Sequence, residues 1–462
     1  MTVRSLLGLA LLNVFLFAIG AGLFWGLRGW RSWVELARLS GVAYMLGAAG
    51  LGVGLSFELV VGIPFSLRTV VLTGLALGGG GVAAGALLRR PLPTWREGSA
   101  RAVAPVVAVY GVLVVVYLEA LFRAGRLASL SAWDAWAFWV PKAKAIYFFE
   151  GLDEQFFREL PNPTYPPLLP ALEASTFLFM GSADVVTLHL QFWFFLCGFA
   201  AALVGLLAPR VSPLVLWPTL LLVLVAPRVV GRSLEPQADF FLDYLFALAA
   251  LLVALWLVER QTWQLASAAL LLGAAMLTKR EGLLLAACVL VAALAASWRT
   301  KRYAWPRLAL VGVVALLLAV PWRLWFSTRD LTGELPEAGA LALFENLDRA
   351  WPAVESVLTT LVDYDLWLAT LPLAAAAVVL AFLGGARVLP VYASLVYGLA
   401  AAGFTWVLWS FTELELPIEQ DEAVNPIVRL VGSLVLLSAA LVPLLLEAAW
   451  RGRGEAIEGR AE

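Results

Sequence analysis

Residues 123–165 carry the side chains of this sequence that are best suited to chemistry. They include the run SAWDAWAFWVPKAKAIYFFEGLD, in which Asp134 lies between Trp133 and Trp136. A carboxylate that ionises and reaches a proton can act as a general base, so Asp134 is the candidate catalytic residue. The alternative is that Asp134 caps a helix that begins near Ala135.

The same segment offers aromatic and basic groups. Trp133 and Trp136 present flat apolar faces to a substrate, or anchor the segment at a membrane interface. Lys142 and Lys144 are candidates for binding an anion. They are separated by about 200° on a helix, so we expect only one to bind, and snorkelling towards headgroups is the alternative for each. Tyr165 is a candidate substrate contact. It begins the sequence YPPLLP, whose prolines favour an extended turn that lies above a cavity.

A second group of charges, Lys279-Arg280-Glu281, joins two apolar runs with almost no loop between them. Ionisable groups at such a place in a membrane protein are costly and usually functional. Arg280 can hold two phosphate oxygens, Lys279 supplies a point charge, and Glu281 can orient one of them. The alternative is an internal ion pair that stabilises a tight hairpin.

Three carboxylates lie at the start of another apolar run, in SLEPQADFFLDY. Glu235, Asp239 and Asp243 are spaced four residues apart, which places them on one face if a helix begins that early. They could bind substrate hydroxyls or a divalent cation, and charge pairing with nearby arginines explains them equally well. We expect no resident metal or other cofactor. Arg429, early in the last apolar run, either completes a phosphate site or pairs with an acid.

Composition places the chain in a membrane. Its 462 residues are 62% hydrophobic and 14% charged, whereas soluble domains contain about 45–50% apolar and about 25% charged residues. The formal net charge of −1 argues against nucleic-acid binding, which calls for a basic surface. Two cysteines and one histidine argue against a disulfide framework and against a Cys- or His-based metal cluster.

A helix needs about 20 mostly apolar residues to cross the hydrocarbon core. We therefore predict an all-α, polytopic membrane protein with about 13 spans. The predicted spans are 6–27, 41–62, 67–88, 102–122, 183–207, 212–230, 239–258, 263–278, 281–298, 307–326, 365–384, 389–410 and 427–449. Residues 136–150 and 166–180 are predicted to lie at the interface instead. The glycine-rich residues 74–87 fall within a span, where small side chains favour close helix packing.

Basic residues in short loops mark the cytoplasmic side of a membrane protein. Alternating spans from an external N-terminus put the C-terminus and the main basic clusters on that side. These clusters are Arg28, Arg31 and Arg38; residues 89–101; residues 299–307; and Arg451 with Arg453. The Asp134 loop then lies outside the cytoplasm, where nucleotide sugars are scarce. The sequence has no phosphate-binding glycine loop on a βαβ unit, so an activated sugar must come from the membrane on a polyprenyl lipid.

Several of these motifs occur together in a known family. WDAWAFW…KAKAIY, then YPPLLPALEA, then a span opening with AD, and then TKREG resemble bacterial members of the GT-C superfamily of polytopic glycosyltransferases. The likeness is to the branch of protein O-mannosyltransferases and aminoarabinose transferases, and it covers residues 102–449. It implies a GT-C-type core at 101–462, with a catalytic loop at 123–182, after a three-helix transmembrane module at 1–100.

The resemblance implies an inverting glycosyltransferase in the plasma membrane of a prokaryote. The donor would be a polyprenyl-phosphate sugar, the acceptor a glycan, lipid or protein of the cell envelope, and Asp134 the base. The protein mannosyltransferases carry two adjacent acids in this loop, whereas Ala135 follows Asp134 here, so a second acid would have to be Asp239 or Glu235. No large domain follows the last predicted span, so residues 327–364, residues 412–426 or a partner protein would recognise the acceptor.

Other classes of protein compete with this reading. A lipid or solute transporter would use the same cavity without chemistry, although transporters often show internal repeats and charges at the membrane midplane, which this sequence lacks. A membrane ligase or polymerase, which moves a whole glycan, would share the phosphate site. A non-catalytic scaffold would leave Lys279 and Arg280 unexplained.

Overall fold

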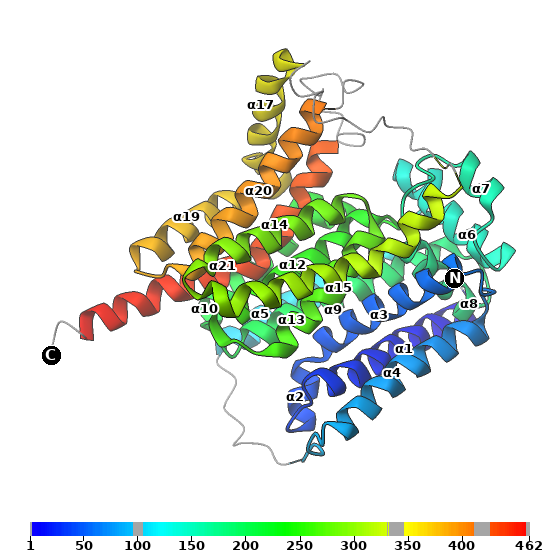
Figure 1. The fold of residues 1–462 in the computed structure, drawn as a ribbon, viewed down its shortest axis with the longest axis horizontal. Helices are drawn as coiled ribbons and strands as arrows, with labels where there is room; N and C mark the ends of the chain where they lie inside the picture. The colour runs from blue at the N-terminus through cyan, green and yellow to red at the C-terminus, as the bar shows by residue number, and fades with distance from the viewer. Residues whose placement is uncertain (1, 96–104, 330, 332–345, 411–425, 459–462) are drawn as a thin grey trace.

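The computed structural model describes residues 2–95, 105–329, 331, 346–410 and 426–458. Within these ranges the chain is helical, apart from turns, short connections and one isolated bridge between Ser32 and Thr94. Nine helices in this part of the chain are long and apolar enough to cross a membrane. The protein is therefore an all-helical, polytopic membrane protein, as its composition predicts (Figure 1).

The nine long helices coincide with nine predicted spans. They are α1 (Val3–Leu27), α3 (Ser40–Val60), α4 (Leu67–Leu87), α5 (Pro105–Gly125), α9 (Val185–Leu207), α12 (Ala238–Glu259), α15 (Lys301–Ser327), α20 (Val388–Ser410) and α21 (Pro426–Glu458). Shorter apolar helices occupy the other four predicted spans. These are α10 (Pro213–Leu224), α13 (Thr262–Thr278), α14 (Glu281–Ala296) and α19 (Thr370–Leu383). The prediction of about 13 full-length spans is thus confirmed for nine.

Local backbone chemistry shortens two of these four helices. The predicted span 212–230 is interrupted at Val225, and Pro227 begins a separate helix, α11 (Pro227–Arg232), because proline is favoured in the first turn of a helix and not inside one. Near residue 365, Leu368 has a φ of 54°, which separates the one-turn helix α18 (Tyr364–Trp367) from α19. A left-handed residue ends a helix.

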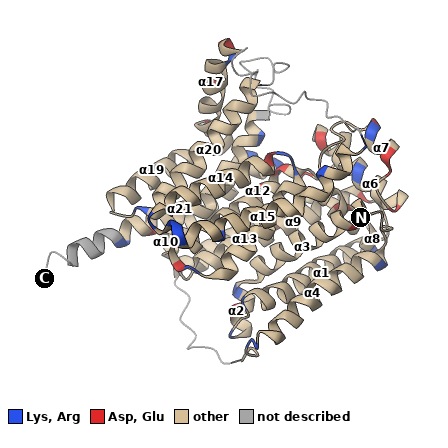
Figure 2. Ribbon diagram, viewed as in Figure 1, with Lys and Arg blue, Asp and Glu red and all other residues tan. Residues whose placement is uncertain are grey.

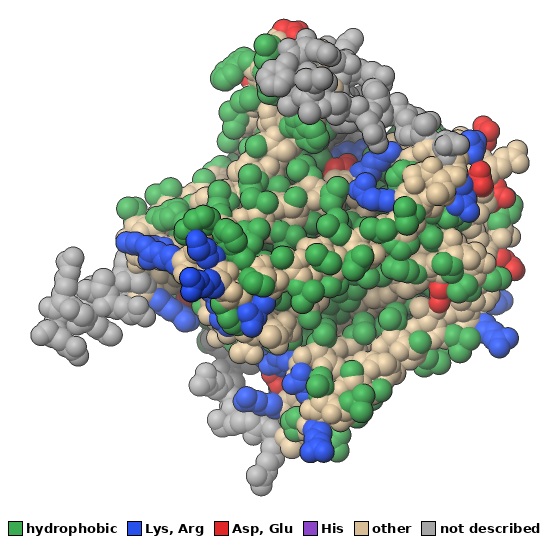
Figure 3. Space-filling model, viewed as in Figure 1, with side chains coloured by type: hydrophobic (Ala, Val, Ile, Leu, Met, Phe, Trp, Pro, Cys, Tyr) green, Lys and Arg blue, Asp and Glu red, His purple; other side chains and the backbone are tan. Residues whose placement is uncertain are grey.

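The long helices differ in how much protein surrounds them. Helix α12 and residues 427–445 of α21 are almost entirely buried and pack on each other, whereas α4 and α5 leave most of their residues only partly buried or exposed. Helix α12 also packs on α13, α13 on α15, and α14 on α20 (Figure 1). Hydrophobic side chains cover the middle of the face in Figure 3, as expected for a surface that meets lipid. Helices α12 and α21 therefore form the centre of the bundle.

Helices α1, α3 and α4 pack closely because glycines remove side chains between them. A Cβ atom on Gly81 would lie 2.3 Å from the carbonyl oxygen of Gly22, and one on Gly20 would lie 1.6 Å from that of Ala43. The glycine-rich segment in α4 thus serves helix packing, which confirms the prediction for residues 74–87.

The first three spans are joined to the rest of the protein by buried hydrogen bonds. Asn13 of α1 donates to Gln191 of α9 at 2.9 Å, and the Gln191 amide donates back to Asn13 Oδ1 at 3.1 Å. The hydroxyl of Tyr44 on α3 donates to Asn13 Oδ1 at 2.6 Å and accepts from Gln191 at 3.1 Å. Because these polar groups satisfy one another inside an apolar bundle, they fix the register of α1 and α3 against α9.

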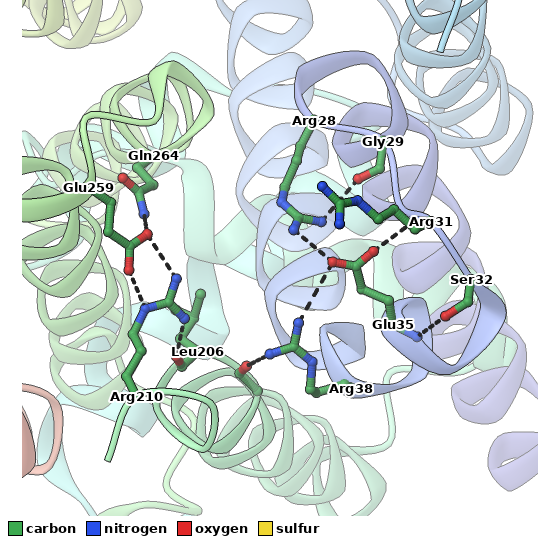
Figure 4. Close-up of polar contacts among 11 residues, drawn as sticks. Arg28, Gly29, Arg31, Ser32, Glu35, Arg38, Leu206, Arg210, Glu259 and Gln264 are labelled. Carbon is green, nitrogen blue, oxygen red and sulfur yellow. Dashed lines mark hydrogen bonds and ion pairs between the residues drawn. The ribbon is translucent and has the colours of Figure 1, made fainter. Parts of the chain in front are cut away.

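Arginines join the same elements at one end of the bundle, shown in Figure 4. Arg38, at the end of α2 (Trp33–Arg38), donates to the carbonyl of Gly205 at 3.1 Å, and Arg210 donates to that of Leu206 at 2.5 Å. Both carbonyls lie in the last turn of α9, where partial negative charge favours cations. Glu259, at the end of α12, accepts from Arg210 Nη2 at 2.8 Å. This end of the bundle therefore gathers arginines from several loops.

The predicted interfacial segments form helices at the opposite end. Helices α6 (Val140–Phe149), α7 (Glu154–Glu159) and α8 (Leu168–Met180) lie where α1 begins, and the C-terminal helix α21 runs away from them (Figure 1). Figure 2 shows both acidic and basic side chains near α6 and α7 and a group of mainly basic side chains near α10. Helix α8 packs on α1, α3 and α6 and is buried along nearly its whole length, so protein covers it, and it does not lie at the interface as predicted.

Candidate functional site

Asp134 lies in the loop between α5 and α6. A π-helix, Ala135–Trp139, follows it directly, and helix α6 continues from there. Asp134 has helical backbone angles, and its side chain makes no capping hydrogen bond. The alternative that Asp134 serves as a helix cap is therefore wrong. Its carboxylate is 7% exposed and faces a residue from the other end of the sequence.

That residue is Arg429, in the first turns of α21. Its Nη2 donates to Asp134 Oδ2, and its Nε donates to Asp239 Oδ2 at 2.9 Å. Asp239 belongs to the first turn of α12, which packs against α21. One guanidinium therefore joins the loop carboxylate to a carboxylate of the buried central helix.

Lys279 extends this arrangement on the far side of Asp239. Its Nζ donates to Asp239 Oδ1 at 2.6 Å and lies 3.0 Å from Glu281 Oε1. Lys279 has extended backbone angles at the end of α13, and Glu281 begins α14, so the tight hairpin itself holds the pair. Asp134, Arg429, Asp239, Lys279 and Glu281 thus alternate in charge, and we call these five residues the charged cluster.

The charged cluster is buried at its centre and more open at two of its members. Asp239 and Lys279 are 6% and 4% exposed, whereas the side chains of Arg429 and Glu281 are 21% and 22% exposed. Burial raises the pKa of Asp134, Arg429 opposes this shift, and the negative charge of Asp239 adds to it. The carboxylate of Asp134 therefore binds a proton more tightly than an ordinary aspartate, which makes it a better base.

Arg280 lies beside the cluster and is exposed. Its Nη2 donates to the hydroxyl of Thr164, and its guanidinium carbon lies 5.8 Å from the centre of the Tyr165 ring. Within the described residues it has no carboxylate partner. Because its charge is not balanced by an acid, Arg280 is the cation best placed to receive an anion from outside.

Tyr165 connects Arg280 to the catalytic loop. Its ring stacks on Trp139, with 5.4 Å between the ring centres and an interplanar angle of 15°, and Lys279 Nζ lies 5.9 Å from its centre. Burial raises the pKa of Tyr165 to about 12, so its hydroxyl stays protonated at neutral pH. A neutral hydroxyl near two cations can donate a hydrogen bond to an oxygen of a bound anion.

The two loop lysines differ in their surroundings. Lys142 is fully buried, and its Nζ donates to the carbonyl of Asn162 at 2.6 Å. The same Nζ lies 5.8 Å from the centre of the Tyr165 ring, on the loop side of that ring. Lys144, two residues along α6, is only half-buried. The structure thus brings Lys279, Arg280 and Arg429 together, and it places Lys142 in the packing of the loop.

The other predicted substrate contacts are spread around the cluster. Trp133 and Trp136 are 47% and 52% exposed and pack edge to face, so their rings remain accessible. Glu235 precedes α12, which begins only at Ala238, and it accepts a hydrogen bond from Ser131 at 2.6 Å. The expectation that Glu235 shares a helix face with the two aspartates of α12 is therefore wrong.

Asp243 and Thr164 complete the surroundings of the site. Asp243 accepts a hydrogen bond from Ser433 of α21, one turn below Arg429. Among the described residues, no group of three or more His, Cys, Asp or Glu side chains could hold a metal ion.

Thr164 is a contact that sequence reasoning misses, and its place between two prolines in NPTYPP is the only signal for it. Residues 332–345 and 411–425, which include most of the predicted acceptor loops, lie outside the described residues.

Comparisons with known proteins add no relative to this description. No protein-family model, no curated protein and no solved structure matches the chain. The chemistry of the charged cluster, Arg280 and the surrounding aromatic rings therefore carries the functional argument.

Proposed function

We propose that this protein is an inverting glycosyltransferase with a GT-C-type core, which transfers a sugar from a polyprenyl-phosphate donor to an acceptor hydroxyl or amine. The observation that carries this proposal is the charged cluster, in which a buried carboxylate of raised pKa lies beside cations at one end of a membrane helix bundle. Base and anion-binding groups side by side are what such a transfer requires.

The distribution of arginines supports an extracytoplasmic active site. Arg38 and Arg210 lie at the bundle end opposite the Asp134 loop, and Arg451 joins them by donating to the carbonyl of Arg210 at 2.9 Å. Basic loops favour the cytoplasmic side, so the Asp134 loop would face the cell exterior of a prokaryote. In this proposal residues 101–462 form the transferase core and residues 1–100 a transmembrane module attached to it.

The donor phosphate enters next to Arg280, an exposed cation that has no acidic partner among the described residues. Arg429 lies within the cluster with its side chain 21% exposed, and it is shared between Asp134 and Asp239. When a phosphate draws Arg429 towards itself, Asp134 loses its counterion and becomes free to accept a proton. Donor binding and activation of the base are thereby linked through one guanidinium.

The reaction is a single displacement. Asp134 takes the proton of the acceptor hydroxyl, and the acceptor oxygen forms a bond to the anomeric carbon of the sugar. The bond between that carbon and the phosphate oxygen breaks, and its electron pair leaves with the polyprenyl phosphate. Lys279, Arg280 and Arg429 stabilise the negative charge that grows on the leaving phosphate, and this stabilisation accelerates the reaction because it is strongest in the transition state.

The test is a transfer assay with purified protein in detergent. Radiolabelled polyprenyl-phosphate sugars would be incubated with a membrane lipid and glycan extract, with wild type beside Asp134→Asn and Asp153→Asn. Asp153 is a matched control, since it caps α7 in the same loop and asparagine can also cap a helix. We expect transfer by wild type and Asp153→Asn only. Equal lipid binding by all three proteins without any transfer would contradict the proposal and favour a lipid transporter.

A further inference from the structure

The turn formed by residues 162–165 is held at three points by different elements. Lys142 of α6 donates to the carbonyl of Asn162 at 2.6 Å. Trp322 of α15 donates through Nε1 to the carbonyl of Thr164 at 3.1 Å, and Arg280 donates to the hydroxyl of Thr164. The turn therefore links the catalytic loop, the hairpin between α13 and α14, and α15.

The backbone of this turn needs such support. Asn162 has a φ of 54°, a left-handed conformation that costs energy for residues other than glycine, although asparagine tolerates it better than most. Its neighbours on both sides are Pro161 and Pro163, which donate no backbone hydrogen bonds. The carbonyl of Asn162 also accepts the N–H of Tyr165 at 3.1 Å, so the ammonium of Lys142 reinforces the same oxygen that closes the turn.

Lys142 is a costly residue at its position. It is fully buried, and four aromatic rings surround its Nζ at 5.7–5.9 Å from their centres. These rings belong to Phe138, Trp139, Phe157 and Tyr165. Ring faces and the carbonyl oxygen of Asn162 are among the groups that compensate the buried ammonium. A lysine contributes what an apolar chain cannot, a hydrogen bond that fixes the turn.

We infer that Lys142 is a positioning residue, which acts on Arg280 through the turn of residues 162–165. By holding Asn162 it fixes Thr164, whose hydroxyl accepts from Arg280, and Tyr165, whose ring centre lies 5.8 Å from both Lys142 Nζ and the guanidinium carbon of Arg280. The function of Arg280 as a phosphate ligand rests on the proposed function. The mechanical coupling between Lys142 and Arg280 does not.

The first experiment measures this coupling without any ligand. Thermal unfolding in detergent would be compared for wild type, Lys142→Met, Arg280→Gln and the double variant. Methionine keeps the length of the side chain and removes its charge and its donor. If both residues hold one turn, the fall in Tm of the double variant is smaller than the sum of the two single falls. Additive falls would overturn the inference.

The second experiment measures the effect on anion binding by the folded protein. The probe is farnesyl phosphate, a short prenyl phosphate, and binding would be followed by native mass spectrometry. We expect Lys142→Met and Thr164→Val each to raise Kd about tenfold, and their combination to raise it no further, because both act through the same turn. Lys301→Met is the control and should leave Kd unchanged, because Lys301 is exposed at the start of α15, at the opposite end of the bundle.

The two experiments separate failure of the inference from failure of the proposed function. If wild type does not bind farnesyl phosphate, the proposed phosphate site is wrong, and the unfolding cycle alone decides on the positioning role. If Lys142→Met does not fold, Trp322→Phe replaces it in both experiments, since phenylalanine removes the donor to Thr164 and keeps an aromatic ring. A Kd raised by Lys142→Met but unchanged in Thr164→Val and Trp322→Phe would contradict positioning and indicate direct contact of Lys142 with the anion.

Discussion

Arg429 and Asp134 form an ion pair although 295 residues separate them in the chain. The same guanidinium also binds Asp239, so one side chain of α21 connects the Asp134 loop to the centre of the bundle. A cation between two carboxylates stabilises both and cannot move without changing both. This relationship determines how the candidate base responds to pH, to substitution and to a bound anion.

The raised pKa of Asp134 predicts the pH dependence of turnover. The carboxyl accepts a proton only when it is ionised, so activity should fall as pH decreases through a value above the ordinary aspartate pKa of about 4. A pH–rate profile of kcat with a saturating polyprenyl-phosphate donor measures this value. An acidic limb at or below the ordinary aspartate pKa would contradict the assignment of Asp134 as a buried base.

The same shift predicts the pH dependence of stability. Because the folded-state pKa of Asp134 is raised, its contribution to stability is fully present below the unfolded-state pKa and is lost as pH rises through the folded-state value. The Tm of wild type, measured relative to the Tm of Asp134→Asn, should therefore fall as pH rises. Asp184→Asn is a control of opposite sign. Burial alone would raise the pKa of Asp184, but hydrogen bonds from Thr187 and from the N–H of Val186 outweigh burial and lower this pKa. The contribution of Asp184 to stability is therefore lost as pH falls.

Removal of Arg429 should destabilise the protein strongly. Arg429→Gln leaves the buried carboxylates of Asp134 and Asp239 without this partner, and breaking such a pair typically costs about 3–5 kcal/mol. The side chain is partly exposed, so we expect a loss near the lower end of that range. Adding Asp134→Asn to Arg429→Gln should restore part of the loss, because Asp239 keeps Lys279 as its partner, whereas Arg429 is the cation that pairs with Asp134 among the described residues. Urea unfolding in detergent measures the free energy of unfolding of the single and the double variant. A double variant that is less stable than Arg429→Gln would argue against the shared ion pair.

Arg280→Gln should lower the affinity for the donor more than it lowers the stability of the protein. A hydrogen bond to a charged group contributes about 1.5–3 kcal/mol, which corresponds to a rise in donor Kd of roughly ten- to a hundredfold. Arg280 is exposed and lacks an acidic partner among the described residues, so Tm should fall only by the modest amount that the loss of its hydrogen bond to Thr164 produces. Arg126→Gln, an exposed arginine of the same bundle end, is the control. Equal donor affinity in wild type and Arg280→Gln would remove Arg280 from the phosphate site.

The buried hydrogen bonds between the first spans and α9 predict that these spans stabilise the whole bundle. Gln191→Leu removes one hydrogen-bond partner each from the buried side chains of Asn13 and Tyr44, which then bond only each other and the carbonyl of Leu9, at an expected cost of about 1–3 kcal/mol. Thermal unfolding monitored by tryptophan fluorescence would show a single transition at lower temperature. The control is Gln261→Leu, an exposed glutamine that precedes α13 at the other end of the bundle. A second, separate transition would indicate that the first three spans unfold as an independent unit.

The sequence by itself determined the class of the protein and the position of its long helices. Nine predicted spans coincide with long apolar helices, because length and apolar composition are local properties that the bilayer thickness constrains directly. It also determined which side chains could do chemistry, since Asp134, Lys279 and Arg429 are ionisable groups in an otherwise apolar chain. Four predicted spans contain helices of fewer than 18 residues; in two of them a proline or a left-handed residue interrupts the predicted span, and average hydropathy does not detect such local breaks.

Only the tertiary structure decided which of these groups meet. Glu235 was grouped with Asp239 by spacing, yet α12 begins too late to align them, whereas Arg429 joins Asp239 from 190 residues away. Likewise, Lys142 and Lys279 look alike in sequence, but one lies in the packing of the loop and the other in the charged cluster. Apolar helices can be rotated and shifted against one another with little change in composition. The partners of each charge therefore follow from the rotation and depth of every helix in the packed bundle, which hydropathy and spacing do not specify.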